Sequence, residues 1–302
     1  MRIPSSPYLL LVITMLCWAG NFVVGRSVHG DIPPVSMAFW RVLATTAVLL
    51  PLAGRELWAE RAVVLRHWRL MTVLGVVGIA AYHASVYTAL SMTTAINVSL
   101  VFAIVPVVIP IFSYLLDGER ITARQMAGIA VSLGGVVAII TRADAAVLLG
   151  LRFNAGDLWM VLGMALWSLF AVLLQRSPAR VPALALLLVL SSLGTVMLAP
   201  VYAWELAALG GFAVDAVNAA SIAFVVVGGV IALTLWTHAV AKVGAAKAGL
   251  FTHLTPVFAV ILAIVLLGET LQPYHVAGTS LIVFGILLTI TVPRAARVRS
   301  GN

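Results

Sequence analysis

The sequence predicts an all-α integral membrane protein of ten transmembrane helices, on three observations. Of the 302 residues, 63% are hydrophobic and only 9% are charged, and the mean hydropathy is +1.13. So few charges cannot cover a soluble protein of 31.9 kDa, and a bilayer must therefore solvate most of the surface. The apolar residues also fall into runs of about 20, the length that crosses a hydrocarbon core of roughly 30 Å.

Ten apolar runs have this length, and charged residues and prolines fall mostly between them. The runs are apolar on all sides, whereas the strands of a membrane barrel would alternate over about ten residues. We therefore expect an α-helical bundle. The predicted spans cover residues 8–25, 36–54, 70–90, 96–116, 123–141, 157–175, 182–203, 219–241, 245–267 and 274–292.

Basic residues gather on one side of this predicted bundle. If the chain starts in the cytoplasm, 14 of the 18 Lys and Arg residues lie in cytoplasmic segments. Three lie on the opposite side and one, Arg41, lies within a span. This is the bias that orients membrane proteins, so both termini are predicted to be cytoplasmic. The pI near 10.4 is thus a topology signal, and no nucleic-acid partner is expected.

The second half of the sequence repeats the first at an offset of about 150 residues. Gly118-Glu119 after span 4 is repeated by Gly268-Glu269 after span 9. The same offset pairs Pro106 with Pro256, Gly128 with Gly278, Gly135 with Gly285 and Ala95 with Ala245.

Each copy of this repeat contains five predicted helices. Because five is an odd number, the second copy must enter the membrane from the opposite side. We expect two inverted repeats, residues 1–148 and 149–302. Inverted repeats are the architecture of many secondary transporters, with the substrate site near the membrane midplane between them.

Several segments of the chain also resemble a known family. They are Trp18-Ala19-Gly20-Asn21-Phe22, Phe39-Trp40-Arg41, Ala89-Leu90 with Ala95, Pro106, and Gly118-Glu119-Arg120-Ile121-Thr122 with Gln125 and Gly128. Their order and spacing resemble the EamA-type transporters of the drug/metabolite transporter superfamily. Within it, the chain is most similar to YddG-type exporters of aromatic amino acids. The resemblance implies a ten-helix, multi-pass protein of a bacterial inner membrane that exports amino acids or related metabolites.

The residues offer little for enzyme chemistry. All ten acidic residues lie in loops or at the ends of predicted spans. The sequence has neither a His-Glu-x-x-His motif nor a Gly-rich phosphate loop with a Lys. Cys17 is the only cysteine, which excludes an intrachain disulfide and a cysteine-cluster metal site. We therefore expect no catalytic residue, no metal and no cofactor.

Polar and ionisable side chains inside the spans are candidates for substrate binding. Arg41 in span 2 either snorkels to the surface or attracts a substrate carboxylate. In span 3, Tyr82, His83 and Tyr87 suit a pocket that holds a ring and orients a polar group. The alternative is that these polar tips bond to neighbouring helices.

Aromatic residues deep in other spans add to these candidates. Trp18 and Trp167 occupy equivalent places in the first helix of each half, with Asn21 one turn from Trp18 and Trp236 in span 8. These tryptophans either stack on substrate or pack the bundle. His238 and His253 complete the substrate-binding candidates, with core hydrogen bonds as their alternative role.

Prolines inside the spans are candidates for hinges. Pro106 and Pro256 interrupt symmetry-related helices, and Pro110 adds to this in the first half only. We predict that spans 3–4 and 8–9 bend there. The repeated Gly-Glu pairs are interpreted as helix ends, with Thr122 and Gln125 forming a capping box.

Together these features predict a carrier with a largely apolar central cavity lined by spans 1, 3, 4, 6, 8 and 9. It would export amino acids, aromatic ones favoured, by alternating access. The lack of a buried acid favours facilitated efflux, and proton coupling through histidine stays open. The expected partners are a small-molecule substrate and the lipid bilayer, with a monomer expected and a dimer left open.

Three alternatives remain to this prediction. The first is broad multidrug or metabolite efflux. The second is exchange of nucleotide sugars or phosphorylated metabolites, which calls for more cavity cations than Arg41, Lys242 and Lys247. The third is a different class, a channel or a non-transporting membrane receptor, which would show neither saturation nor counterflow.

Overall fold

The computed structural model describes residues 6–28, 30–93, 98, 101–152, 154–267 and 270–290. Within these residues every regular element is a helix, which confirms the predicted all-α class. Ala95, Gly268 and Glu269, which contribute to the sequence repeat, lie outside the described residues.

The long helices follow the predicted spans closely. Eight of those in the described residues are long and apolar enough to cross a membrane, and two shorter apolar helices occupy the places of predicted spans 4 and 10. The elements are α1 (Pro7–Ser27), α2 (Pro34–Ala59), α3 (Arg61–Arg66), α4 (Trp68–Leu74), η1 (Gly75–Ala81), α5 (Tyr82–Met92), α7 (Val105–Asp117), α8 (Ala123–Ile140), α9 (Ala145–Leu149), α10 (Ala155–Leu174), α11 (Ala183–Leu209), α12 (Ala216–Val243), α13 (Ala245–Leu250), η2 (Phe251–His253), α14 (Leu254–Leu267) and α15 (Pro273–Ile290).

The ends of several helices are set by local chemistry. α7 ends at Gly118, whose φ of 68° is favourable only for a residue without a side chain. Thr122 and Gln125 then form the predicted capping box at the start of α8. α2 and α11 each begin directly after a proline, Pro33 and Pro182, with nearly the same backbone angles.

The two predicted mid-span kinks are breaks in the helices. Residues 103–104 form a turn before α7, which places Pro106 in its first turn. In the second half a 3-10 segment, η2, interrupts the span just before Pro256. A proline lacks the N–H for the bond to the preceding turn and its ring crowds that carbonyl, so each helix restarts at the proline.

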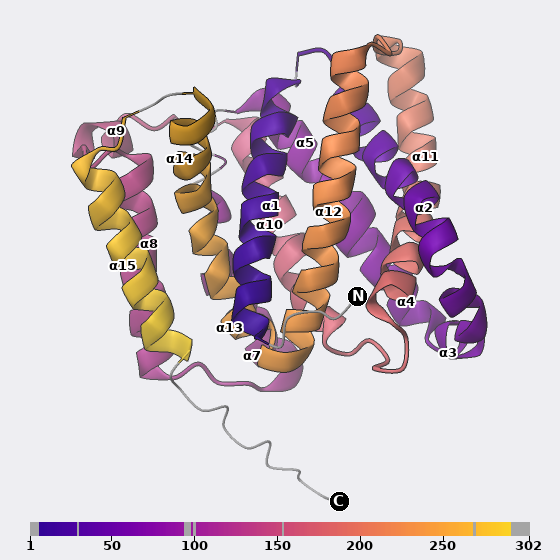
Figure 1. Cartoon of the computed structure of the whole chain (residues 1–302), viewed down its shortest axis with the longest axis horizontal. Helices are drawn as coiled ribbons and strands as arrows, with labels where there is room; N and C mark the ends of the chain where they lie inside the picture. Colours follow the sequence, from indigo (N-terminus) through magenta and orange to yellow (C-terminus); the bar gives the residue numbers. More distant parts are fainter. Residues whose placement is uncertain are drawn as a thin grey trace, which may run out of the picture.

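The helices of the two halves pack in matched pairs. α1 contacts α12 and α14, while α10, the corresponding first helix of the second half, contacts α5 and α7. α2 packs against its counterpart α11, and α8 against its counterpart α15. In Figure 1, α8 and α15 form one flank of the molecule and α2 with α11 the other, with α1, α10 and α12 between them.

Four glycines bring α8 and α15 into close contact. A Cβ at Gly128 would lie 2.6 Å from the Gly285 carbonyl oxygen, and one at Gly135 would lie 2.5 Å from that of Gly278. Residue numbers rise along α8 where they fall along α15, so the two helices are antiparallel. Backbones this close depend on the absence of side chains, which explains why glycine occupies these positions in both helices.

Residues at equivalent positions of the two halves touch one another. The hydroxyls of Thr46 and Thr195, 149 positions apart, lie 3.3 Å from each other. The rings of Trp18 and Trp167 have the same sequence separation and are 4.9 Å apart between centroids. Contacts between equivalent residues are what a two-fold relation between the halves produces near its axis.

Candidate functional site

A small cavity lies at the centre of the bundle, where the two halves meet. Its volume is about 60 Å³. Seven of the predicted site residues line it: Trp18, Asn21, Arg41, Tyr82, His83, Tyr87 and Trp167. The other lining residues are Phe22, Val42, Thr45, Gly78, Ile79, Val86, Leu90, Leu187, Ser191, Gly229 and Leu233.

The helices around this central cavity differ from the predicted set. Its lining comes from α1, α2, η1, α5, α10, α11 and α12. Predicted spans 2 and 7 therefore contribute, whereas no described residue of spans 4 and 9 does. The expectation for spans 4 and 9 was wrong because their interrupted helices, α7 and α13–α14, contact α10 and α1 without lining the space between the halves.

Arg41 points into the central cavity. Its Nη1 donates a hydrogen bond of 3.1 Å to the hydroxyl of Tyr87. The guanidinium lies beside Gly229 of α12, where a Cβ would be only 2.9 Å from Nη2. Of the two roles open from the sequence, the geometry fits the inward one, since a charge in a span normally faces a cavity or a partner.

His83 and Tyr82 directly follow a π-helical segment. This segment, η1, covers Gly75–Ala81, and such segments are rare and frequent at functional sites. His83 Nδ1 lies 2.7 Å from the Ile79 carbonyl oxygen. Since that oxygen can only accept, Nδ1 carries a proton, and Nε2 is the ring nitrogen left for a ligand.

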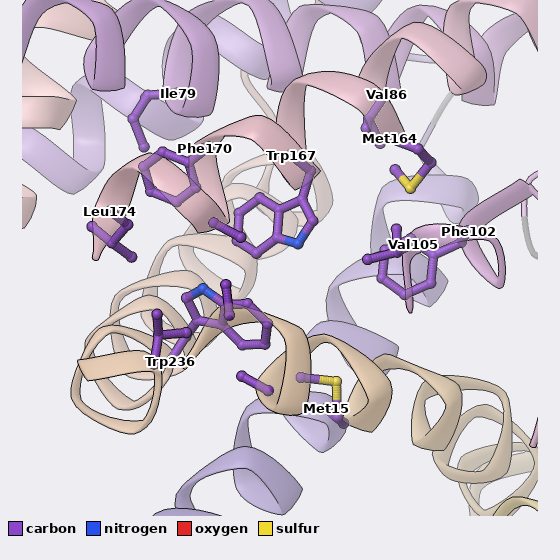
Figure 2. Close-up of a cluster of buried hydrophobic side chains, with 14 of the residues drawn as sticks. Met15, Ile79, Val86, Phe102, Val105, Met164, Trp167, Phe170, Leu174 and Trp236 are labelled. Atoms are coloured by element: carbon purple, nitrogen blue, oxygen red, sulfur yellow. The ribbon is translucent and has the colours of Figure 1, made fainter. Parts of the chain in front are cut away.

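Three tryptophans form an aromatic cluster beside the cavity. Trp18 lies 5.2 Å from Trp236 and Trp167 lies 5.5 Å from Trp236, between ring centroids. Figure 2 shows Trp167 and Trp236 in a group with Met15 of α1 and Phe170 of α10. Trp236 is fully buried and contacts the cavity residues Trp18 and Trp167 without itself lining the space.

Several buried polar atoms at this site have no partner among the described residues. They include the indole nitrogens of Trp167 and Trp236 and the side-chain oxygen of Asn21. The amide nitrogen of Asn21 donates to the Val225 carbonyl oxygen, 3.4 Å away. An unsatisfied buried polar group costs about 1–3 kcal/mol, so the Trp167 and Asn21 atoms, whose residues line the cavity, are suited to bind a ligand or water that enters it.

His253 lies away from the central cavity. It is completely buried, with Nε2 at 2.8 Å from the Ala103 carbonyl oxygen and Nδ1 at 2.7 Å from the Ser132 hydroxyl. Ala103 is in the turn that precedes Pro106, so His253 supplies a donor to a carbonyl near that helix break. We therefore leave His253 out of the proposed binding site.

Two further cavities lie toward opposite ends of the bundle, and we name them after the orientation that the basic residues predict. The inner cavity has a volume of about 660 Å³ and contains the last substrate-binding candidate, His238. It is lined by Leu174, Gln175, Ser177, Pro178, Ala179, Val181, Pro182, Ala183, Leu186, Thr237, His238, Val240 and Ala241. The outer cavity has a volume of about 10 Å³ and is lined by Gly25, Val28, Ile32, Pro34, Met37, Tyr87, Leu90 and Ser91.

Metal-binding chemistry is not evident in the described part of the chain. No group of three or more His, Cys, Asp or Glu side chains is placed there to hold an ion.

Comparison with known proteins gives the family. A sequence profile described as the EamA-like transporter family matches residues 5–141 and again residues 154–291. The chain belongs to the EamA-like transporter family. It is therefore a multi-pass membrane protein with the apolar helices of a transporter.

Individual EamA relatives are distant in sequence. An uncharacterized transporter of Archaeoglobus fulgidus is 27% identical over 94% of this chain and 97% of its own length. A probable terminal-alkyne amino-acid exporter of Streptantibioticus cattleyicolor is 27% identical over 92% of this chain and 91% of its own. The aromatic amino acid exporter YddG of Ancylobacter novellus is 26% identical over 59% of this chain and 61% of its own.

A solved crystal structure shares the fold of this chain. The two superpose with a TM-score of 0.73 at 23% identity, over 95% of this chain and 96% of the other. The relatives named above are transporters and exporters, which is consistent with a protein that is not an enzyme.

Proposed function

We propose that this EamA protein exports amino acids, with aromatic amino acids favoured, across a bacterial inner membrane by alternating access. The observation that carries the proposal is the division of the central cavity into two chemistries. Arg41 with the Tyr87 hydroxyl forms a cationic, hydrogen-bonding side. Trp18 and Trp167 form an aromatic side.

This division fits a zwitterion with an apolar side chain. A guanidinium binds a carboxylate through charge-assisted hydrogen bonds, and indole rings pack against an aromatic side chain at about 4.5–7 Å. His83 Nε2 and the Asn21 side-chain oxygen are acceptors suited to a substrate ammonium group. Amino acids are also the named cargo of two relatives.

The proposal includes ten spans arranged as two inverted repeats, residues 1–148 and 149–302, with cytoplasmic termini. Three observations support it. The family profile matches twice, the helices of the halves pack in matched pairs, and equivalent residues such as Thr46 and Thr195 touch. Such an arrangement allows two states of similar energy that expose one site to opposite sides.

The central cavity is contracted in this structure. Its 60 Å³ is far below the roughly 300–1,000 Å³ of typical small-molecule sites. Substrate binding therefore requires the helices around it to move apart, as expected of a carrier that closes around its cargo.

The charge at the site argues against cargo with several negative groups. Among the residues that the structure describes, Arg41 is the only Lys or Arg that lines the central cavity. A nucleotide sugar or phosphorylated metabolite calls for more cations than one. A single guanidinium suits one carboxylate. No described residue of the lining is an acid that could carry a proton, so we propose facilitated export.

Transport assays in proteoliposomes test this proposal. Uptake of labelled tryptophan by the purified protein should saturate, and unlabelled phenylalanine or tyrosine should compete. Phosphorylated metabolites should not compete. Uptake that rises linearly with concentration would indicate a channel, and competition only from unrelated cations would move the assignment to broad drug efflux.

A further inference from the structure

We propose that Glu205 is the latch that holds the outer side of the transport pathway closed, in a structure whose inner end is open while its central cavity is contracted. This inference rests on the proposed alternating access and adds a gating residue and a conformational state to it. It comes from comparing the inner and outer cavities.

The inner and outer cavities are lined by equivalent residues of the two halves. Each residue of the outer lining has its counterpart 149 or 150 positions later in the inner lining. For example, Met37 of α2 corresponds to Leu186 of α11, and Leu90 to Val240. The cavities are thus one structural feature built twice, once toward each end of the bundle.

Although the linings correspond, the two cavities are in different states. The inner cavity has a volume of about 660 Å³ and the outer cavity about 10 Å³. The inner lining reaches Thr237, the next residue after Trp236, which packs on the cavity residues Trp18 and Trp167. The inner cavity therefore comes within one residue of the aromatic cluster beside the central cavity.

Glu205 closes the outer end by binding the start of α2. Its carboxylate accepts hydrogen bonds from the backbone N–H of Val35 at 2.9 Å, and from the N–H and hydroxyl of Ser36 at 2.6 and 2.7 Å. The N–H groups of a first helical turn have no partner within the helix and lie at the positive end of its dipole. A carboxylate is a strong ligand for that site.

The contact is deeply buried and braced by aromatic rings. Glu205 is only 3% exposed. One turn away, Tyr202 of α11 stacks on Phe39 of α2 with ring centroids 4.3 Å apart and an interplanar angle of 3°. The outer lining residues Pro34 and Met37 are on the same turn of α2 that Glu205 binds. The latch therefore holds shut the turn that would have to move for the outer cavity to open.

The equivalent residue at the inner end is placed differently. The position that corresponds to Glu205 is Glu56, which is exposed and not buried against the first turn of α11. That turn includes Ala183, which lines the inner cavity. The outer end of the antiparallel α2–α11 pair is thus held by a buried carboxylate. At the inner end Glu60 makes an ion pair of 3.5 Å with Arg180, whose side chain is 79% exposed, and exposed pairs of this kind contribute little.

Breaking this latch should shift the protein toward its outward-open state. In Glu205→Gln the amide nitrogen replaces an acceptor and faces donors already present, so at least one bond is lost. The residues that report the shift are the equivalent pair Val28 of the outer lining, which is buried, and Ser177 of the inner lining, which is partly exposed. In a cysteine-free background made by Cys17→Ala, single Val28→Cys and Ser177→Cys variants in nanodiscs are labelled with a water-soluble maleimide without substrate.

With Glu205 present, Ser177→Cys should react readily and Val28→Cys should resist labelling. Adding Glu205→Gln should raise the labelling rate of Val28→Cys roughly tenfold or more, as loss of one hydrogen bond to a charged group predicts, and lower that of Ser177→Cys. The matched control Glu56→Gln should change neither rate. Ser36→Ala, which keeps both backbone bonds, should give a smaller rise and serves as the test if Glu205→Gln does not fold.

The latch would be overturned if monodisperse Glu205→Gln protein labelled at both cysteines at unchanged rates. If only Ser36→Ala folds, unchanged rates in that variant would overturn it. Equal effects of the Glu205 and Glu56 substitutions would overturn it as well. Since the labelling needs no substrate, a shift in both rates supports the latch even if no amino acid is transported. Failure of the proposed cargo is therefore distinguishable from failure of the latch.

Discussion

The two halves of the molecule contribute very different chemistry to the central cavity, although they contribute matching helices. In the first half, Asn21, Arg41, Tyr82 and His83 line the cavity. The equivalent positions in the second half hold Phe170, Leu190, Ala232 and Leu233. Only the tryptophans, Trp18 and Trp167, are the same on both sides.

This difference separates two requirements of a carrier. Alternation needs two halves that can exchange conformations, so the packing residues, such as the glycines of α8 and α15, are repeated. Recognition of a cargo with distinct ends needs a site that is not symmetric, so the polar groups occur once. Substitutions at equivalent positions should therefore have equal effects in the packing and unequal effects in the site.

The largest difference in effect on transport is expected between substitutions of Arg41 and of Leu190, its equivalent in the second half. Arg41→Gln removes the one Lys or Arg found among the described lining residues, and a hydrogen bond to a charged group contributes about 1.5–3 kcal/mol. The KM for tryptophan uptake should rise roughly 10- to 100-fold. Leu190→Met, the matched substitution in the second half, should stay within about twofold because it conserves volume. Equal losses from both substitutions would refute a one-sided site.

Equal effects are expected at the glycines of α8 and α15. A Cβ at Gly128 or at its counterpart Gly278 overlaps the partner helix, and overpacking costs about 1–3 kcal/mol. Gly128→Val and Gly278→Val should lower the thermal unfolding midpoint in detergent by similar amounts. Gly134→Val is the control, since a Cβ there meets nothing within 4 Å. A loss in only one half would argue against matched packing.

Substitutions at the two helix breaks should slow transport to different extents, with a smaller difference than between Arg41 and Leu190. Pro106→Ala and Pro256→Ala each restore a backbone donor and favour a continuous helix, so both should slow transport. Pro256→Ala should slow it more, since Pro110, inside α7, still removes one backbone hydrogen bond when Pro106 is replaced. Initial uptake rates at saturating tryptophan measure this. Unchanged rates in both variants would remove the hinge hypothesis.

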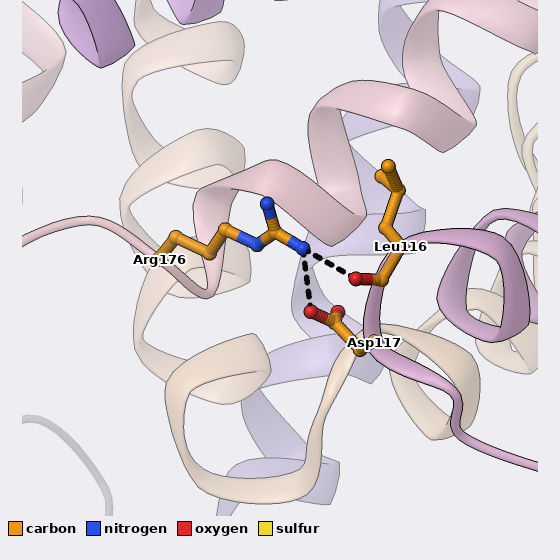
Figure 3. Close-up of polar contacts among 3 residues, drawn as sticks. All are labelled: Leu116, Asp117 and Arg176. Atoms are coloured by element: carbon orange, nitrogen blue, oxygen red, sulfur yellow. Dashed lines mark hydrogen bonds and ion pairs between the residues drawn. The ribbon is translucent and has the colours of Figure 1, made fainter.

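The smallest effect is expected at a surface ion pair that joins the halves. Arg176 Nη2 lies 2.6 Å from an Asp117 carboxylate oxygen and 2.8 Å from the Leu116 carbonyl oxygen (Figure 3). The Arg176 side chain is 43% exposed, and such pairs contribute about 0.2–1 kcal/mol. Arg176→Ala should leave uptake within about twofold. A loss of uptake as large as that expected for Arg41→Gln would show that this ion pair holds the inner end of the pathway closed.

Much of the fold could be predicted from the sequence because the bilayer imposes long apolar runs. The bounds of α10 and α12 lie within a few residues of predicted spans 6 and 8. The helix breaks at Pro106 and Pro256 were visible as prolines, whereas the π-helical turn of η1 has no comparable signal. The only residue of η1 that the structure links to a special packing need is Gly78, where a Cβ would overlap the Phe170 ring.

The site was harder to predict because it depends on which helix faces which. The sequence placed Tyr82, His83 and Trp167 among the candidates, and the structure brings them to one cavity. It could not place His253, whose partner Ala103 is 150 residues away. Glu205 was classed only as an acid near a span end, since its role depends on α11 reaching Leu209 and meeting the first turn of α2.

Counterflow tests the central claim most directly. Proteoliposomes loaded with excess unlabelled tryptophan are diluted into a trace of labelled tryptophan, and the internal label is followed against unloaded vesicles. A carrier with one site exposed alternately to the two sides should show faster, transient accumulation of label in the loaded vesicles. Equal uptake in loaded and unloaded vesicles, for tryptophan and for every amino acid that competes with it, would contradict the account.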